Sequence, residues 1–254
     1  MDREDGAMAM KPHVLVVAGS DSSGGAGIVR DIETLAAFGV KASVAITAVT
    51  VQTHGSVQHV EVVSPDIVAA QMRASLAANT VAAVKIGMLG TADTVAAVAG
   101  VLADYPEIPV VLDPVLVSTS GTALLPAEAK PRLLDLFRRC TLATPNLPEL
   151  SWLASRPSDE VTVQAGILIK SGAQAVLVKG GHGAGEQSID LLARPDLPDH
   201  PFASPRLAAT MRGTGCMLAS AIAARLAYGD ELSIAVLAAK SHVHGKLSEH
   251  IQPS

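Results

Sequence analysis

Residues 13–28, HVLVVAGSDSSGGAGI, begin a pattern that the rest of the chain repeats. The valine-rich run from His13 to Ala18 predicts a short buried strand. A glycine-rich segment follows this run, and the amphipathic stretch from about Ala26 to Phe38 predicts a helix. The glycines resemble a phosphate loop, but no lysine follows them, so neither dinucleotide nor P-loop spacing is met. The stretch therefore predicts a βα unit, with an ordinary tight turn as the plainer interpretation of its glycines.

Apolar runs and amphipathic stretches continue to alternate along the chain. Strands are predicted at residues 42–49, 57–63, 81–86, 109–112, 140–143 and 175–178. Helices are predicted at residues 64–77, 91–103, 158–171 and 231–249, with further candidates after Asn146 and from Gly213 to near Gly229. Residues 187–204 predict a β-excursion that reaches the active crevice. Because strands alternate with helices, we expect an α/β fold of three layers, α/β/α, around a mostly parallel central sheet.

Length and composition narrow the class of protein. With 254 residues, 49% of them hydrophobic, the chain suits one large domain at residues 13–254, preceded by a flexible tail at residues 1–12. A net charge of −5 and no basic run longer than Arg138-Arg139 argue against nucleic acid and anionic membranes as partners. No apolar run approaches the roughly 20 residues of a membrane helix. Cys140 and Cys216 give no disulfide framework, so a reducing cytoplasm is expected.

A second glycine run lies in TMRGTGCMLAS, residues 210–220, before an amphipathic stretch that ends near Gly229. Glycines allow a sharp turn, and the free N–H groups at the start of a helix attract an anion. Cys216 falls in the first turn, where the helix dipole is expected to lower the pKa of its thiol. The alternative is a common glycine turn followed by a buried cysteine, and the stretch alone favours neither interpretation.

Polar and small residues follow the predicted strands at their carboxyl ends. These residues are Gly19 to Asp21, Gln52, Met88, Asp113, Asn146, Glu149 and Lys179. Taken singly, Asp31 and Glu149 are better explained as helix-end acids, and Met88 as core filler. Lys179 is either a solvated strand end or a phosphate contact. Because ligands of open parallel sheets bind at the carboxyl ends of the strands, the shared location of these residues predicts one binding crevice.

Six separated motifs resemble those of the hydroxymethylpyrimidine/phosphomethylpyrimidine kinases, a family of the ribokinase-like superfamily that acts in thiamine biosynthesis. They are GSDSSGGAGI with Asp31, KIGML, DPVLVSTSG, TPNLPE, VKGGH and GTGC, in this order over roughly residues 14–228. The resemblance implies a ribokinase-like fold. It also implies an ATP- and Mg²⁺-dependent kinase that phosphorylates 4-amino-5-hydroxymethyl-2-methylpyrimidine and its monophosphate, and a homodimer.

The resemblance implies a role for each residue that matches a motif. The pyrimidine pocket is implied for Gly19, Asp21, Ala26, Asp31, Gln52, Met88 and Val115. The anion hole and the catalytic group are implied for Gly213, Thr214, Gly215 and Cys216. The nucleotide site is implied for Asn146, Lys179, Arg212 and Thr214, and the Mg²⁺ site for Asp113 and Glu149. Cys216 stands where many sugar-kinase relatives have an aspartate base, a role that requires a lowered thiol pKa.

The chain departs from the family pattern at Arg212, where histidine is usual, and at Met217, where threonine or serine is usual. Arg212 adds a cation beside the predicted anion hole and is expected to strengthen phosphate binding. Two alternatives stay open. One is a pyridoxal kinase, because the two pockets accept similar hydroxymethyl heterocycles. The other is a non-catalytic pyrimidine-binding paralogue, against which Cys216, Asp113 and Glu149 argue.

Overall fold

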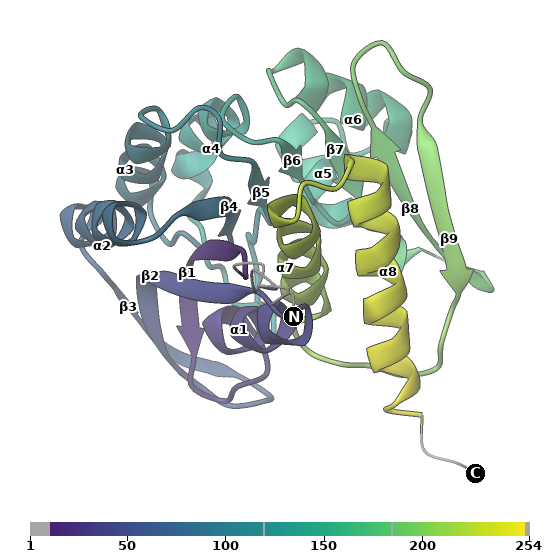
Figure 1. Cartoon of the computed structure of the whole chain (residues 1–254). Helices are drawn as coiled ribbons and strands as arrows, with labels where there is room; N and C mark the ends of the chain where they lie inside the picture. The colour runs from purple at the N-terminus through teal and green to yellow at the C-terminus, as the bar shows by residue number, and fades with distance from the viewer. Residues whose placement is uncertain (1–10, 119, 184, 252–254) are drawn as a thin grey trace, which may run out of the picture.

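One mixed sheet of nine strands forms the centre of the computed structural model, which describes residues 11–118, 120–183 and 185–251 (Figure 1). The strands are β1 (His13–Asp21), β2 (Lys41–Gln52), β3 (Val57–Val62), β4 (Val81–Ile86), β5 (Val110–Leu112), β6 (Leu142–Ala143), β7 (Val176–Val178), β8 (Gln187–Ala193) and β9 (His200–Pro205). Their order is β3-β2-β1-β4-β5-β6-β7-β8-β9. The pairings from β2 through β7 are parallel, whereas β3 at one edge and the β8–β9 hairpin at the other are joined antiparallel.

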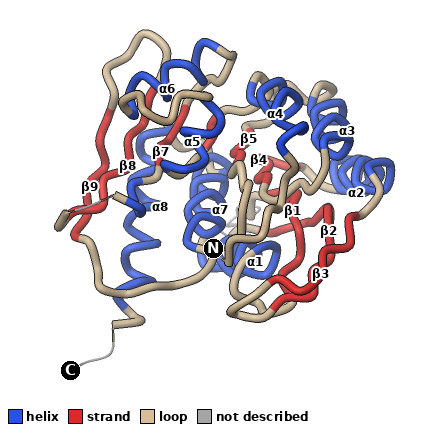
Figure 2. The backbone as a smooth tube through the Cα atoms, turned by 180° about the vertical axis from the view of Figure 1, so that it is seen from behind, coloured by secondary structure: helices blue, strands red, loops and turns tan. Residues whose placement is uncertain are grey.

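Helices cover both faces of the sheet. One face carries α1 (Gly27–Ala37), α7 (Thr214–Ala227) and α8 (Leu232–Ser248). The other carries α2 (Pro65–Ala78), α3 (Ala92–Leu102), α4 (Lys130–Phe137), α5 (Leu147–Ala154) and α6 (Val161–Lys170). Figures 1 and 2 show α7 and α8 packed side by side, with α2, α3 and α4 gathered at the other end of the sheet. The predicted three-layer fold is confirmed.

The residues of β1 show why the central strands form apolar runs. Leu15 and Val17 pack in the cluster that contains α2 to α6, whereas Val14 and Val16 pack in the cluster that contains α1, α7 and α8. All four are fully buried because a parallel strand is covered on both faces. Each such side chain contributes about 1.5–3 kcal/mol relative to an exposed one.

The structure differs from the sequence-based expectation in some elements. Helix α4 was not predicted, and a short 3-10 turn, η1 (Ala127–Ala129), precedes it. A second one, η2 (Gly180–His182), follows β7. The excursion predicted at residues 187–204 is the β8–β9 hairpin, and the edge strand predicted at residues 57–63 is β3.

The predicted tail, residues 1–12, lies outside the described residues except for Lys11 and Pro12. The tail and the single domain at residues 13–254 therefore stay predictions. No helix within the described ranges has the length and apolar character that crossing a membrane requires.

Candidate active site

Two glycine loops touch where α1 and α7 begin. Gly213 has a φ of +74°, and a Cβ at this position would lie 2.5 Å from the carbonyl oxygen of Gly25. Gly27 has a φ of +58°, and its Cβ would lie 2.4 Å from the carbonyl oxygen of Gly19. Only glycine fits these close approaches. Neither N-cap residue, Ala26 or Gly213, caps its helix with a side chain. The Gly27 N–H faces the Cys216 thiol, and the N–H groups at the start of α7 are available to an anion.

Gly215 brings the α7 loop to a charged group at the carboxyl ends of β5 and β7. A Cβ on Gly215 would lie 3.2 Å from Nζ of Lys179 and 3.4 Å from a carboxylate oxygen of Asp113. Lys179 Nζ donates to Oδ1 of Asp113 at 2.6 Å and lies 3.7 Å from Oε2 of Glu149. The structure therefore brings the predicted anion hole, Asp113, Glu149 and Lys179 into one site.

Local sequence explains how Glu149 reaches this site. Asn146 and Glu149 form a capping box at the start of α5, in which each side chain accepts a hydrogen bond from the other's backbone N–H at 2.8–2.9 Å. Asn146 also pairs with Lys179 as an isolated bridge between the two segments. The Asn146 side chain thus serves the helix start, and its predicted contact with a nucleotide stays a prediction.

Charge is unbalanced in this group. Burial raises the pKa of the Glu149 carboxyl, and the neighbouring Lys179 ammonium only partly offsets this rise. Burial acts to lower the pKa of Lys179, but Asp113 and Glu149 raise it above its usual range. One ammonium therefore faces two carboxylates, and the site has an excess of negative charge.

This donor set fits Mg²⁺ as proteins usually bind it in phosphoryl-transfer sites. The described residues contain no group of three or more His, Cys, Asp or Glu that could hold a metal without further ligands. However, Mg²⁺ in such sites is typically bound by one or two carboxylates together with waters and substrate phosphates. Asp113 and Glu149 supply that number of carboxylates.

Asp31 is not the helix-end acid that its position suggested. It lies in the second turn of α1, and its side chain and that of Lys85 on β4 are both 0% exposed. Lys85 Nζ lies 2.8 Å from the Asp31 carboxylate, to which Ser220 Oγ also donates at 2.8 Å. Burial acts to lower the pKa of Lys85, but the adjacent Asp31 carboxylate raises it well above its usual range. The interpretation of Asp31 as a helix-end acid is therefore wrong.

Cys216 lies in the first turn of α7, as predicted, but the expected pKa of its thiol is wrong. Burial raises that pKa to about 11. Lys85 and the Gly27 backbone N–H lower it, whereas Asp31 and Asp113 raise it. Desolvation of the thiolate outweighs the favourable N–H group and cation, so Cys216 is a thiol at neutral pH.

Several residues assigned to the pyrimidine pocket lie around the end of β1. A Cβ on Gly19 would lie 3.0 Å from Sδ of Met88. Ala26 is the N-cap residue of α1, and Val115 follows Asp113 after β5. The end of β2 is tied to the first glycine loop because Gln52 N donates to Ser22 Oγ at 2.8 Å. Gly19, Ala26, Gln52 and Met88 therefore share one region, and contact with a pyrimidine stays a prediction for all the assigned residues.

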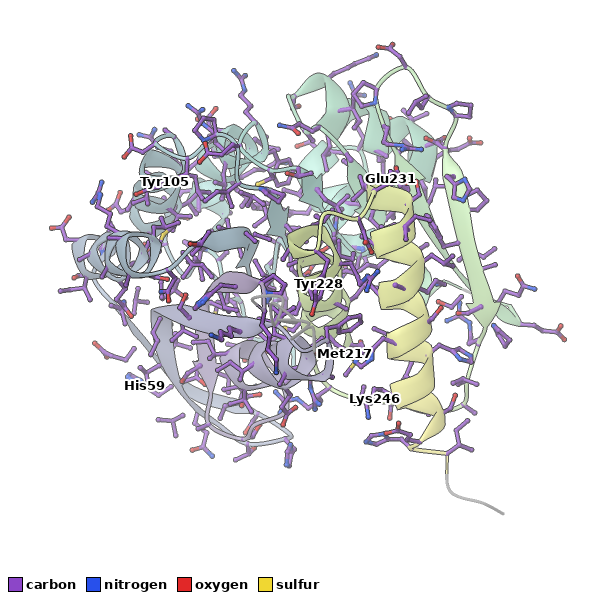
Figure 3. All side chains as sticks on the ribbon, viewed as in Figure 1. His59, Tyr105, Met217, Tyr228, Glu231 and Lys246 are labelled. Carbon is purple, nitrogen blue, oxygen red and sulfur yellow. The ribbon has the colours of Figure 1, made fainter. Side chains whose placement is uncertain are left out.

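Arg212 joins three segments around the same region. Its guanidinium donates to Asp21 at 3.2 Å, to Ser23 Oγ at 2.9 Å and to the carbonyl oxygen of Thr53 at 3.0 Å. Arg212 therefore contacts Asp21, a residue assigned to the pyrimidine pocket. Its own assignment to the nucleotide site stays a prediction. The second departure, Met217, is buried within α7 (Figure 3).

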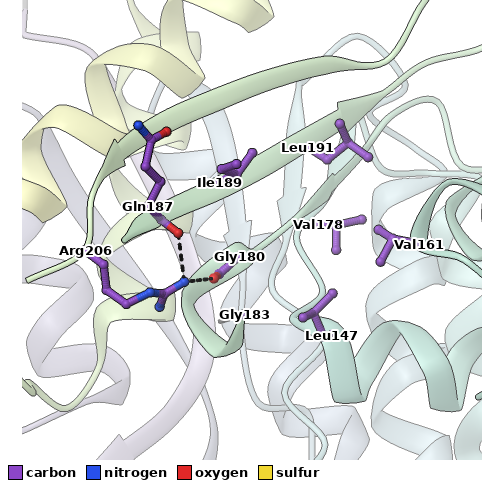
Figure 4. Close-up of a pocket in the computed structure, with 9 residues that line it drawn as sticks. All are labelled: Leu147, Val161, Val178, Gly180, Gly183, Gln187, Ile189, Leu191 and Arg206. Atoms are coloured by element: carbon purple, nitrogen blue, oxygen red, sulfur yellow. Dashed lines mark hydrogen bonds between the residues drawn. The ribbon is translucent and has the colours of Figure 1, made fainter. Parts of the chain in front are cut away.

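A cavity of about 220 Å³ lies beside the turn that follows β7 (Figure 4). Val178, Ile189 and Leu191 line it, together with Leu147 and Val161 from the starts of α5 and α6. Arg206 borders the cavity and donates to the carbonyl oxygens of Gly180, Gly181, Gly185 and Gln187. None of the residues assigned to the pyrimidine lines this cavity.

Sequence reasoning missed three charged residues near the site: Lys85, Asp190 and Arg206. Lys85 carried a signal, because a lysine inside the apolar strand VAAVKI needs a buried partner. Asp190 similarly lies within an apolar stretch of β8. Arg206 follows β9 in a polar region and carried no such signal.

Residues 21–254 match the family model described as phosphomethylpyrimidine kinase. The chain belongs to the phosphomethylpyrimidine kinase family. A hydroxymethylpyrimidine/phosphomethylpyrimidine kinase of Rhizobium meliloti is 43% identical over 92% of this chain and 90% of the relative. A thiamine biosynthesis bifunctional protein of Geobacter sulfurreducens is 42% identical, and the match covers 91% of this chain and 48% of that longer protein.

Solved structures of related kinases have the same fold. Phosphomethylpyrimidine kinase of Clostridium difficile superposes with a TM-score of 0.81 at 33% identity, over 93% of this chain and 99% of that chain. Pyridoxal kinase of Staphylococcus aureus in complex with ADP superposes with a TM-score of 0.85 at 27% identity, over 96% of this chain and 90% of that chain. These comparisons confirm the predicted family, the ribokinase-like fold, the phosphotransferase class and the link to thiamine biosynthesis.

Proposed function

We propose that this member of the phosphomethylpyrimidine kinase family transfers the γ-phosphate of ATP to 4-amino-5-hydroxymethyl-2-methylpyrimidine and then to its monophosphate. One observation carries the proposal. The uncapped start of α7 lies against Asp113 and Lys179, with Glu149 beside them. Phosphoryl transfer depends mainly on positioning and on neutralising charge at the transferred group, and this arrangement offers N–H donors, an ammonium and carboxylates within one site.

The residues then have distinct tasks. Backbone N–H groups at the start of α7, from Thr214 onward, stabilise the charge that develops on the phosphoryl oxygens. Lys179 binds a phosphate oxygen, for which it exchanges its contact with Asp113. Asp113 and Glu149 would hold Mg²⁺, largely through water, and this ion neutralises phosphate charge when it is bound. On the other side of the glycine run, Gln52 faces the pyrimidine ring.

Cys216 is the proposed acceptor of the hydroxyl proton. Because its thiol pKa is raised to about 11, only a small fraction is thiolate at neutral pH. A loose phosphoryl-transfer transition state needs little removal of the proton from the attacking hydroxyl before the phosphoryl group is well advanced. A weakly populated base is therefore compatible with turnover, and it makes the rate depend on pH.

The deciding experiment measures ADP release with ATP and Mg²⁺ on a panel of acceptors. We expect ADP release that depends on the pyrimidine, both with the alcohol and with its monophosphate as the acceptor. Pyridoxal is the competing acceptor, because a pyridoxal kinase shares the fold at 27% identity. Higher kcat/KM on pyridoxal would replace the proposed substrate. Pyrimidine binding without ADP release would instead favour the non-catalytic paralogue.

We further propose a cytoplasmic homodimer that pairs through the outer surface of β2 and β3. Val49 and Val51 lie two residues apart on β2 and are about half exposed, so one face of this edge presents two apolar side chains to solvent, next to Glu61 and His59 on β3. A second copy would cover it. Light scattering should give the mass of two chains for the parent and of one chain for Val51→Lys; an unchanged mass for the variant would place the interface elsewhere.

A further inference from the structure

A buried ion pair joins α8 to the β8–β9 hairpin behind the turn that follows β7. Lys240 Nζ donates to Oδ2 of Asp190 at 2.8 Å, and each side chain is 8% exposed. The other carboxylate oxygen, Oδ1, accepts a hydrogen bond from the backbone N–H of Gly180 at 2.8 Å. One carboxylate therefore connects a helix to the backbone of the residue directly after Lys179.

The Lys179–Gly180 turn has little freedom against β8. A Cβ on Gly180 would lie 1.8 Å from the carbonyl oxygen of Ile189, so only glycine allows the two backbones to approach this closely. On the preceding side, Lys179 N donates to the carbonyl oxygen of Pro145 at 2.9 Å. Arg206 donates to the carbonyl oxygen of Gly180 at 3.2 Å (Figure 4). Asp190 supplies the contact that holds the Gly180 N–H.

We propose that Asp190 is a positioning residue for the phosphates of the nucleotide, and that Lys240 fixes the orientation of its carboxylate. This inference rests on the proposed ATP site at Lys179. If the Gly180 N–H loses its acceptor, the turn relaxes away from β8. Lys179 then moves relative to Asp113 and Gly215, and nucleotide binding weakens. The pyrimidine region at Gln52 and Met88 is built from other segments and is unaffected.

A gain in stability does not explain why this buried ion pair is present. Exchanging a buried ion pair for apolar residues of similar volume is often neutral or stabilising, whereas removing one partner leaves an unpaired buried charge and is costly. A test must therefore remove both charges together. The informative difference is whether position 190 keeps an oxygen for the Gly180 N–H.

Two double variants provide this comparison in one background. Asp190→Leu/Lys240→Met removes both charges and the acceptor, and Asp190→Asn/Lys240→Met removes both charges but keeps an amide oxygen. For the leucine variant we expect the KM for ATP to rise roughly three- to tenfold, the usual worth of one hydrogen bond. For the asparagine variant we expect the KM for ATP to stay within about twofold of the parent, a change smaller than the loss of one hydrogen bond would cause. The KM for the pyrimidine should be unchanged in both.

Hydrogen exchange at the Gly180 amide gives a readout that needs no activity. The leucine variant should exchange this amide faster than the parent, and the asparagine variant should not. Equal ATP KM values for the two variants with equal exchange would overturn the inference, as would a matching rise in the pyrimidine KM. Thermal unfolding shows whether each variant is folded, and Asp190→Ala/Lys240→Met replaces the leucine variant if that one does not fold.

The two proposals fail in different ways. If the parent releases no ADP with any acceptor, the proposed function is wrong. The positioning role is then judged by calorimetric binding of ATP and by the Gly180 exchange rate. If the parent is active and the leucine variant keeps both its ATP KM and its Gly180 protection, the proposed function stands and the role of Asp190 is wrong.

Discussion

The Asp31–Lys85 pair and the Asp113–Lys179–Glu149 group use the same side-chain chemistry in two settings. Asp31 and Lys85 are both fully buried, and one carboxylate balances one ammonium. In the second group, Lys179 is 13% exposed and one ammonium faces two carboxylates. The first group has no unmet charge and no access to solvent. The second has an excess of negative charge, is partly exposed to solvent and lies against the glycine run.

This difference separates a structural ion pair from a binding site. Both groups act on Cys216, whose thiol pKa is raised by burial, lowered by Lys85 and raised by Asp31 and Asp113. The balanced pair therefore has no charge left for a ligand, and we expect a cation and phosphates to bind at the unbalanced group. Each of the following substitutions tests one side of that contrast.

The largest expected effect is at Cys216, between the two groups. Cys216→Ala should lower kcat by roughly 10²–10⁴-fold, the usual worth of a positioned acid–base group. Pyrimidine affinity should change far less, because the thiol acts on the proton. Cys140→Ala is the matched control: Cys140 is buried away from the site, so this change should cost about 1 kcal/mol of stability and leave kcat near normal. If Cys216→Ala lowers kcat by no more than about threefold, a loss far smaller than that range, the assignment of Cys216 as the base is wrong.

The second effect is on stability. Asp31→Asn leaves the Lys85 ammonium buried without its counter-charge, so we expect the free energy of unfolding to fall by about 3–5 kcal/mol. The double variant Asp31→Leu/Lys85→Met removes both charges and should lose much less. Denaturant unfolding at neutral pH measures both. A loss below about 1 kcal/mol for Asp31→Asn, well under the cost of breaking a buried pair, would mean that the pair is not formed in solution.

The fold was predictable because its signal is local. Each buried parallel strand is a short apolar run, and α3, α5 and α8 begin at a capping side chain, as in the capping box of Asn146 and Glu149. Helix α4 was missed because it has only eight residues and the charged sequence KPRLLDLF. Its apolar face is Leu133, Leu136 and Phe137, too short a repeat to stand out.

The shared location of Asp113, Glu149 and Lys179 was predictable from the sequence, whereas the electrostatics of the region were not. Asp113 and Lys179 follow strands whose carboxyl ends share one edge, so the topology alone brings them together. Asp31 pairs with Lys85, which lies 54 residues away in the sequence on another strand. No feature of the sequence near Asp31 predicts that contact. The thiol pKa of Cys216 depends on burial by several segments of the chain. From the sequence, only the position of Cys216 at the start of a helix could be predicted.

The third expected effect is the pH dependence of kcat. A base must lose its proton before it accepts one, and the Cys216 thiol has a pKa raised to about 11. Below that pKa the thiolate fraction rises about tenfold for each pH unit, so kcat should increase about 100-fold from pH 7 to pH 9. Cys216→Asp provides the comparison, because the ordinary pKa of a carboxyl lies roughly four to five units below that of a thiol, so its profile should be flatter at the same site. A flat profile for the parent would contradict the thiolate role.

The smallest expected effect comes from converting the unbalanced group into a balanced one. Glu149→Gln keeps a side chain that supports the capping box at the start of α5, so the fold should be retained. It removes one of the two carboxylates, and Asp113 and Lys179 then form a one-to-one pair like Asp31 and Lys85. We expect the Mg²⁺ concentration for half-maximal activity to rise about tenfold, at the lower end of the effects reported for groups that support a metal.

The same variant has a stability signature with a defined sign. Burial raises the pKa of Glu149, so the folded parent binds this proton more tightly than the unfolded chain. The contribution of Glu149 to stability is therefore largest below the unfolded pKa and is lost as pH rises through the folded pKa. Glu149→Gln lacks this titration, so its unfolding temperature should fall less than that of the parent between mildly acidic and neutral pH. If both proteins show the same pH dependence and the same Mg²⁺ requirement, the excess carboxylate has no role and the contrast between the two charged groups is wrong.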